Sequence, residues 1–189
     1  MTVFLSASVP LPDRDPRFFE TADVIAIRDA VKAFVQEFGP RHRVHFGGHP
    51  AVTPLVSLMM KRHPEVENQH LYLYQSRFFS DQFPEENFDF VHKVYVDGVP
   101  GDREQSLLLM RQRMLTDKPI TAAFFIGGME GVIDEYQLIK KHQPGAKCFP
   151  VASTGGASLQ IFQSSEFDPM LINELTYRTL FRSIRKSLP

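Results

Sequence analysis

The stretch from Ala122 to Tyr136, AAFFIGGMEGVIDEY, constrains the fold of this chain more than any other segment. Its first five residues are apolar, and so short a run is typical of a strand buried on both faces of a parallel sheet. Glycines follow at positions 127, 128 and 131, and the apolar spacing after them is helical. This order favours anion binding, because glycines admit a ligand to the backbone and the first helical N–H groups lack partners. A tight strand-to-helix connection without a ligand gives the same pattern.

Expected strands and helices alternate along the rest of the chain. We expect strands at Thr2–Leu5, Arg43–Phe46, Leu71–Tyr74, His92–Val96, Ala122–Ile126 and Cys148–Val151. We expect helices at Ala22–Phe38, Val52–Arg62, Asp102–Leu115, from Gly131 to about Lys141, and at Pro169–Ser187, with an irregular segment at Arg77–Phe90. The alternation implies parallel pairing through right-handed crossovers. The predicted fold class is therefore α/β, a three-layer α/β/α sandwich with a mainly parallel sheet.

Composition limits the classes of protein to which the chain can belong. Its 189 residues suit one domain, residues 1–189. The formal net charge of −1 gives no indication that the chain binds nucleic acid or an anionic membrane. Cys148 is the single cysteine, so no intrachain disulfide forms, and we expect it to serve as a small buried hydrophobe. The N-terminus lacks the features of a signal peptide, and no apolar run is long enough to span a membrane. We therefore expect a soluble, cytoplasmic domain.

Four of the expected strands end in small or glycine-rich polar turns, at Ser6–Ser8, Gly47–His49, Gly127–Gly131 and Ser153–Gly156. Ligands of an open parallel sheet bind outside the carboxyl ends of its strands, so we expect these turns to line one crevice. Their number favours a nucleotide-like ligand. The candidate contacts at the turns are Ser6, Ala7, Ser8, Gly47, Gly48, His49, Gln75, Ser76, Gly127, Gly128, Met129, Glu130, Gly131, Ser153, Thr154, Gly155 and Gly156.

Four segments together resemble the SLOG superfamily of LOG-like and Smf/DprA-like domains. They are FLSAS at residues 4–8, FGGHPAVTPLV at 46–56, FIGGMEGVIDEY at 125–136 and PVASTGGA at 150–157. More narrowly, they resemble the stand-alone cluster linked to bacterial conflict systems. The resemblance implies a Rossmann-like fold. It also implies either a phosphoribohydrolase, which releases a base from a nucleoside 5′-monophosphate, or a sensor of nucleotide-derived signals such as relatives of cyclic ADP-ribose.

The LOG signature is a Met-x-x-Arg helix followed by Pro-Gly-Gly-x-Gly-Thr-x-x-Glu. Met110 and Arg113 match its first part, and the three glycines with Glu135 match its second part. The resemblance thus implies that Arg113 and Glu135 bind the ligand, and that they are the catalytic residues if the protein is an enzyme. From the residues alone, Glu135 can also complement the helix dipole, and Arg113 can be an ordinary surface arginine.

Three departures from the LOG signature affect the implied activity. Ile126 replaces the proline, Val132 replaces the threonine, and one extra residue within Met129-Glu130 precedes the third glycine. These changes alter the phosphate cradle, so they favour binding over hydrolysis. His45 and His49 flank a glycine turn, but no cysteine accompanies them, and we expect neither a metal nor a cofactor.

Two functions remain open from the sequence. The preferred hypothesis is a sensor that binds a nucleotide-derived ligand of the ADP-ribose or cyclic ADP-ribose type in a bacterial defence or signalling system. The alternative is a phosphoribohydrolase or a related enzyme that cleaves the N-glycosidic bond of a nucleotide. The phenylalanines of Arg77–Phe90 can belong to the core or to a subunit contact, so we expect a homo-oligomer. A sensor without a second domain also requires a separate effector protein.

Overall fold

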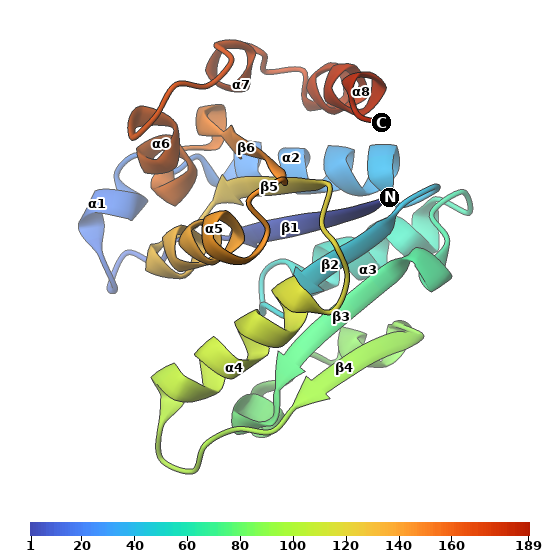
Figure 1. Ribbon diagram of the computed structural model, residues 1–189, viewed down its shortest axis with the longest axis vertical. Coiled ribbons are helices and arrows are strands. Elements are labelled where there is room, and N and C mark those ends of the chain that lie inside the picture. The colour runs from blue at the N-terminus through green and yellow to red at the C-terminus, as the bar shows by residue number, and fades with distance from the viewer.

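Six short, mostly apolar segments form one entirely parallel sheet in the computed structural model, which describes residues 1–189 (Figure 1). Its order is β4-β3-β2-β1-β5-β6. Every residue of β5 is buried, which explains its continuous apolar sequence, whereas every residue of the edge strand β4 is half-buried. The strands are β1 Thr2–Ser8, β2 Arg43–Gly47, β3 Leu71–Ser76, β4 His92–Val96, β5 Ala122–Gly127 and β6 Lys147–Val151.

Helices cover both faces of this sheet and confirm the Rossmann-like three-layer α/β/α sandwich (Figure 1). Successive strand residues point to opposite faces, so Phe124 belongs to one core with α2, α3 and α8, and Phe125 to the other with α4, α5 and α6. The helices are α1 Pro16–Phe19, α2 Val24–Phe38, α3 Thr53–Arg62, α4 Arg103–Thr116, α5 Glu130–His142, α6 Gly156–Gln163, α7 Met170–Asn173 and α8 Tyr177–Ser187. None of them combines the length and apolar character required to cross a membrane.

Aspartates fix the first residue of two long helices. The Asp23 carboxylate accepts a hydrogen bond from the Ala26 N–H, so α2 begins at Val24 rather than at Ala22. The Asp102 carboxylate likewise accepts from the Gln105 N–H and confirms the predicted start of α4.

The expectation of one C-terminal helix over Pro169–Ser187 is wrong, because α7 and α8 are separate helices. Glu174 between them has an extended backbone, and its carboxylate accepts a hydrogen bond from the Thr176 N–H, which ends the helical pattern. Helix α6, which begins directly at the turn after β6, was not expected from the sequence.

The irregular segment between β3 and β4 forms two 3-10 helices, Arg77–Gln82 and Glu85–Asp89. Its phenylalanines differ in their surroundings. Phe90 is buried in the core that includes α3, whereas Phe88 is 83% exposed. Two further 3-10 helices, Asn68–His70 and Ala152–Thr154, adjoin β3 and β6.

A nearly buried carboxylate on α2 contacts the polar side of α8. The Glu37 side chain is 6% exposed, and its Oε1 accepts from Arg178 Nε at 3.3 Å and from Arg182 Nη2 at 3.0 Å. Arg185 Nε lies 3.5 Å from Oε2. Burial opposes ionisation of this carboxyl, but the hydrogen bonds from Arg182 and Arg178 outweigh it and lower the pKa of Glu37. These ion pairs therefore hold α8 against α2, in addition to the contacts that the buried apolar residues of α8 make with the core.

We expect Glu37→Gln to lower the free energy of unfolding by about 2 kcal/mol at pH 7. Because the pKa of Glu37 is lowered by folding, its contribution is complete above the unfolded pKa of about 4.3. The difference from wild type should therefore shrink as the pH falls through the folded pKa. Urea unfolding at pH 7 and at pH 3 measures both values, with the exposed Glu166→Gln as control. A destabilisation that is equal at both pH values would contradict this role.

Candidate functional site

A cavity of about 920 Å³ opens at the carboxyl ends of β1 and β2 and extends between α4 and α5. The strand order reverses between β1 and β5, and such a reversal is where open α/β sheets bind ligands. The volume lies within the range of small-molecule sites. Its lining includes Leu5, Ala7, Ser8, Arg14, Gly47, Gly48, His49, Arg103, Glu104, Leu107, Leu108, Met110, Arg111, Met129, Glu130, Gly131, Val132, Asp134, Glu135, Gln137, Leu138 and Lys141.

The N-terminus of α5 lies at this cavity. Gly127 and Gly128 have positive φ angles of 58° and 86°, which turn the chain sharply from β5 towards the helix. Met129 precedes α5, provides no side-chain cap, and has an N–H group that donates to no protein acceptor. The N–H groups of the first helical turn also lack acceptors within the helix. This end of the cavity therefore favours an anion.

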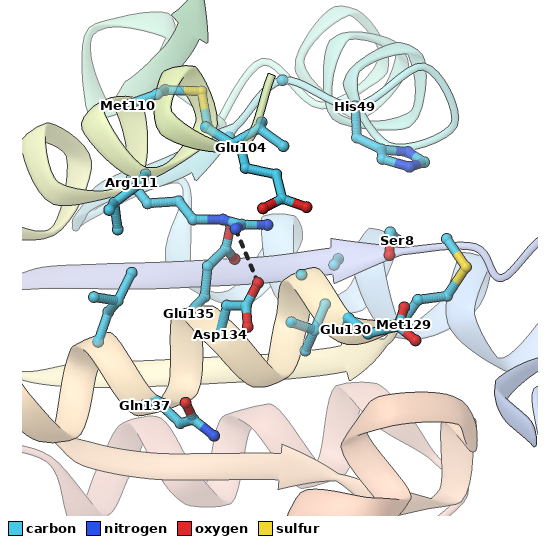
Figure 2. Close-up of a pocket in the computed structure, with 18 of the residues that line it drawn as sticks. Ser8, His49, Glu104, Met110, Arg111, Met129, Glu130, Asp134, Glu135 and Gln137 are labelled. Atoms are coloured by element: carbon cyan, nitrogen blue, oxygen red, sulfur yellow. Dashed lines mark hydrogen bonds and ion pairs between the residues drawn. The ribbon is translucent and has the colours of Figure 1, made fainter. Parts of the chain in front are cut away.

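Glu135 connects three elements at the side of the cavity (Figure 2). Its Oε2 accepts a hydrogen bond of 2.5 Å from the Ser6 hydroxyl at the end of β1. Its Oε1 lies 3.4 Å from Arg111 Nε of α4, and Arg111 Nη1 also lies 3.0 Å from Asp134. The side chains of Glu135 and Arg111 are only 14% and 15% exposed. Burial raises the pKa of the Glu135 carboxyl, although Arg111 and the Ser6 hydroxyl oppose the shift.

Gly131 allows Arg111 to reach this carboxylate. A Cβ atom at position 131 would lie 2.6 Å from Arg111 Nη2, so the guanidinium would have to shift from this position. The third glycine of the turn thus makes room for a cation from the neighbouring helix.

His49 contributes a neutral donor from the turn after β2. Its Nδ1 accepts a hydrogen bond from the Ala51 N–H at 3.1 Å, so the proton of the neutral ring must be on Nε2. Burial lowers the pKa of His49, and the positive charge of Arg14 lowers it further. Arg14 and His49 both line the cavity.

Charges of both signs line the cavity. Arg14, Arg103, Arg111 and Lys141 are the cations, and Glu104, Glu130, Asp134 and Glu135 are the carboxylates. Arg111 is engaged by two of the carboxylates, whereas Arg14 and Arg103 are exposed. This arrangement suits a ligand that carries both anionic groups and hydroxyl donors.

A family model described as the SLOG cluster3 family matches residues 17–185. The chain belongs to this family. The match confirms the resemblance to the SLOG superfamily and suggests nucleotide-related binding or a LOG-like function. Ser6, Ala7 and Ser8 lie before the matched residues. No curated protein and no solved structure matches the chain significantly.

Nine of the residues that we expected to contact a ligand line the cavity of this SLOG protein. They come from the last residues of β1 and β2, from the turns after β2 and β5, and from the first two turns of α5, and they are Ala7, Ser8, Gly47, Gly48, His49, Met129, Glu130, Gly131 and Glu135. Ser6 is buried below them and contacts Glu135. Gly127 and Gly128 shape the turn without lining the cavity.

Arg113 does not occupy the position that the SLOG resemblance implies for it. Its guanidinium is 59% exposed and forms an ion pair of 3.2 Å with Asp117, one helical turn away. Arg111 instead contacts Glu135. Arg111 lies on the side of α4 that lines the cavity, as do Leu107 and Leu108. Two residues of separation place these arginines about 200° apart around the helix. The motif alone could not identify the side of α4 that faces α5.

Gln75 and Ser76 lie beneath the turns and do not line the cavity. Ser76 is fully buried, and its hydroxyl accepts a hydrogen bond from the Phe78 N–H. The Gln75 amide donates to the Asn87 carbonyl at 3.4 Å and lies against Gly48. Gln75 therefore supports the turn after β2, and Ser76 caps the 3-10 helix Arg77–Gln82 that follows β3.

The turn Ser153–Gly156 after β6 also has a structural role. The Thr154 hydroxyl accepts a hydrogen bond of 2.8 Å from the Gly127 N–H, and the Ala157 N–H donates to the Gly128 carbonyl at 2.9 Å. None of residues 153–156 lines the cavity. The expectation that all four turns line one crevice is therefore wrong for the last of them, which instead holds the glycine turn of β5.

Several cavity residues had no clear signal in the sequence. Glu104, Leu107 and Leu108 resemble ordinary residues of an amphipathic helix, and their position depends on the packing of α4 beside α5. Asp134 was visible as a carboxylate near the glycine turn, and Arg14 as a cation after the first strand.

We expect Gly155→Ala to lower the free energy of unfolding by at least about 3 kcal/mol. Gly155 has a φ of 69°, and a Cβ atom there would lie 1.8 Å from the carbonyl oxygen of Thr21. Gly101 provides a matched control, because its φ is 74° but no atom lies within 4 Å of the added Cβ. Gly101→Ala should cost only about 1 kcal/mol. Urea unfolding measures the free energy of unfolding of both variants. Equal destabilisation by Gly155→Ala and Gly101→Ala would show that steric crowding at Gly155 is unimportant.

Proposed function

We propose that this SLOG protein binds a nucleotide-derived ligand of the ADP-ribose or cyclic ADP-ribose type and acts as a sensor. The observation that carries the proposal is that one cavity contains both the N-terminus of α5 and the largely buried Glu135. The first group favours phosphates, and the second accepts hydrogen bonds from hydroxyls. A nucleotide carries both groups within one molecule.

The phosphates of the ligand bind at the first turn of α5. Backbone N–H groups provide donors there, and Arg14 and His49 line the same cavity and offer further donors. Arginine suits this role because its planar fork matches phosphate oxygens. The ribose hydroxyls then lie near Glu135.

The apolar part of the cavity takes the base. Leu107 and Leu108 of α4 and Leu138 of α5 line the groove between these helices. Gly131 and Lys141 are both lining residues and are ten positions apart on α5, which corresponds to about 15 Å along the helix. A ligand with several linked groups fits this length better than a lone phosphate.

The surroundings of Glu135 support binding rather than hydrolysis. Hydrolysis requires a carboxylate that activates water or stabilises the developing oxocarbenium ion. Ser6 and Arg111 instead fix the two carboxylate oxygens of Glu135, and each oxygen keeps a second lone pair that can accept from a ribose hydroxyl. Val132, which replaces the threonine of the LOG signature, is buried and offers no hydroxyl.

One observation favours the alternative, a phosphoribohydrolase. Burial raises the pKa of Glu135, and a raised pKa is typical of a carboxyl group that donates a proton during catalysis. The experiment below therefore measures binding and cleavage together.

The resemblance to a cluster linked to bacterial conflict systems supports a role in defence or signalling. In that role the bound ligand changes contacts with a separate effector protein or between copies of this chain.

We expect ADP-ribose or cyclic ADP-ribose to bind the wild-type protein in calorimetry and to remain intact on chromatography after prolonged incubation. Glu135→Gln and Arg111→Ala should each weaken binding about 10- to 100-fold, because each removes charged hydrogen-bonding groups at the cavity. Arg113→Ala is the matched control. Its side chain points to Asp117, so affinity should change less than about twofold.

Release of a free base by the wild type would contradict the sensor proposal. The hydrolase would be supported if Glu135→Gln lost about 100- to 10,000-fold of that turnover with little change in affinity.

A further inference from the structure

A second cavity, of about 240 Å³, lies between the C-terminal end of α2 and α8. Its position is near the amino ends of the strands, since α2 leads directly into β2 there, and both chain termini lie on this side of the molecule (Figure 1). It is therefore separate from the cavity at the N-terminus of α5. The lining consists of Gln36, Glu37, Pro40, Arg41, Glu65, Arg178, Arg182 and Arg185.

We propose that this second cavity is a binding site for a phosphate group. Four arginines line it, against the two carboxylates of Glu37 and Glu65. Glu65 is half-exposed, and its Oε1 lies 3.3 Å from His63 Nδ1, whereas it forms no ion pair with the arginines of the cavity. The cavity thus has a formal excess of two positive charges, and arginine keeps its charge at every physiological pH.

The arginines retain donors that no protein group uses. Arg178 and Arg182 each donate one hydrogen bond to Glu37 out of the five N–H groups of a guanidinium, and both side chains are at least half exposed. Arg185 Nε is buried but makes no hydrogen bond, because its 3.5 Å contact with Glu37 is poorly aligned. Arg41 takes no part in the ion pairs of Glu37.

A purely structural role does not account for this number of cations. Glu37 is one carboxylate, and two arginines already donate hydrogen bonds to it. Each further guanidinium repels the others, so the excess is unfavourable until an anion is present. The positive charge of these arginines also acts on His42. The pKa of His42 is lowered to about 4, mainly by burial and also by the N-terminal amine, Arg185 and Arg41.

Phosphate is the anion that fits best. Its tetrahedral oxygens accept paired hydrogen bonds from several guanidinium forks at once, and the cavity is large enough for a phosphate group and a small substituent. It is about a quarter of the volume of the first cavity, so a whole dinucleotide does not fit. The second site therefore binds either inorganic phosphate or a small phosphorylated metabolite.

The test is a titration of the full-length, ¹⁵N-labelled protein with inorganic phosphate at constant ionic strength, followed by NMR. We expect saturable shifts of the amides at the end of α2 and in α8, and of the Arg Nε–H signals. Arg41→Ala should weaken phosphate binding about tenfold without loss of the folded spectrum, because it removes charged donors but breaks no ion pair with Glu37. Arg41→Lys should restore part of the affinity. Glucose 6-phosphate in place of phosphate then distinguishes a phosphorylated metabolite from the free ion.

Arg28→Ala on α2 is the control, since Arg28 is half-exposed, pairs with its neighbour Asp29 and does not line the second cavity. The Arg28→Ala variant should bind phosphate with the same affinity as the wild type. The proposal is overturned if chloride at the same ionic strength causes the same shifts. It is also overturned if the shifts do not saturate, or if Arg41→Ala and Arg178→Ala bind phosphate as tightly as the wild type. Shifts confined to the first turn of α5 would likewise refute it, because they would assign the phosphate to the other cavity.

Discussion

The right-handed crossover between parallel strands determines where this molecule can bind a ligand. The chain moves from β1 through α2 to β2 in one direction along the sheet, and from β5 through α5 to β6 in the other. Because the hand of the crossover is fixed, α2 and α5 must cover opposite faces. Their connecting turns diverge at the carboxyl ends of β1 and β5, so the cavity there follows from the order of the strands.

Glu135 gives this opening a defined chemistry. A carboxylate that is only 14% exposed loses hydration free energy. The contacts with Arg111 on α4 and Ser6 on β1 offset this loss. The same contacts hold α4, α5 and β1 in one geometry before any ligand arrives. A binding group fixed in this way loses little conformational entropy when the ligand binds.

Most of the fold could be predicted from the sequence, because apolar runs and glycine turns are local signals. All six strands and the parallel sheet are confirmed, and so are the helices that begin at strong caps. The residues of the binding site were harder to predict from the sequence. The turn at Ser153–Gly156 has the same composition as a ligand-binding loop, yet it serves the neighbouring turn through Thr154. The choice between Arg111 and Arg113 depends on which side of α4 packs beside α5, a long-range property that no local pattern encodes.

The hydrogen bond from the Ala51 N–H to the His49 ring has a consequence for the conditions under which the first cavity can work. With Nδ1 occupied as an acceptor and the pKa of the ring lowered, His49 stays uncharged at neutral pH and on mild acidification. It offers the same Nε2–H donor throughout that range. Three of the four cations that line the cavity are guanidinium groups, which do not titrate in this range. The His49 donor and these cations should therefore serve a ligand equally well across mild changes of pH, so any pH dependence of binding in this range should come from the Glu135 carboxyl, whose pKa is raised by burial.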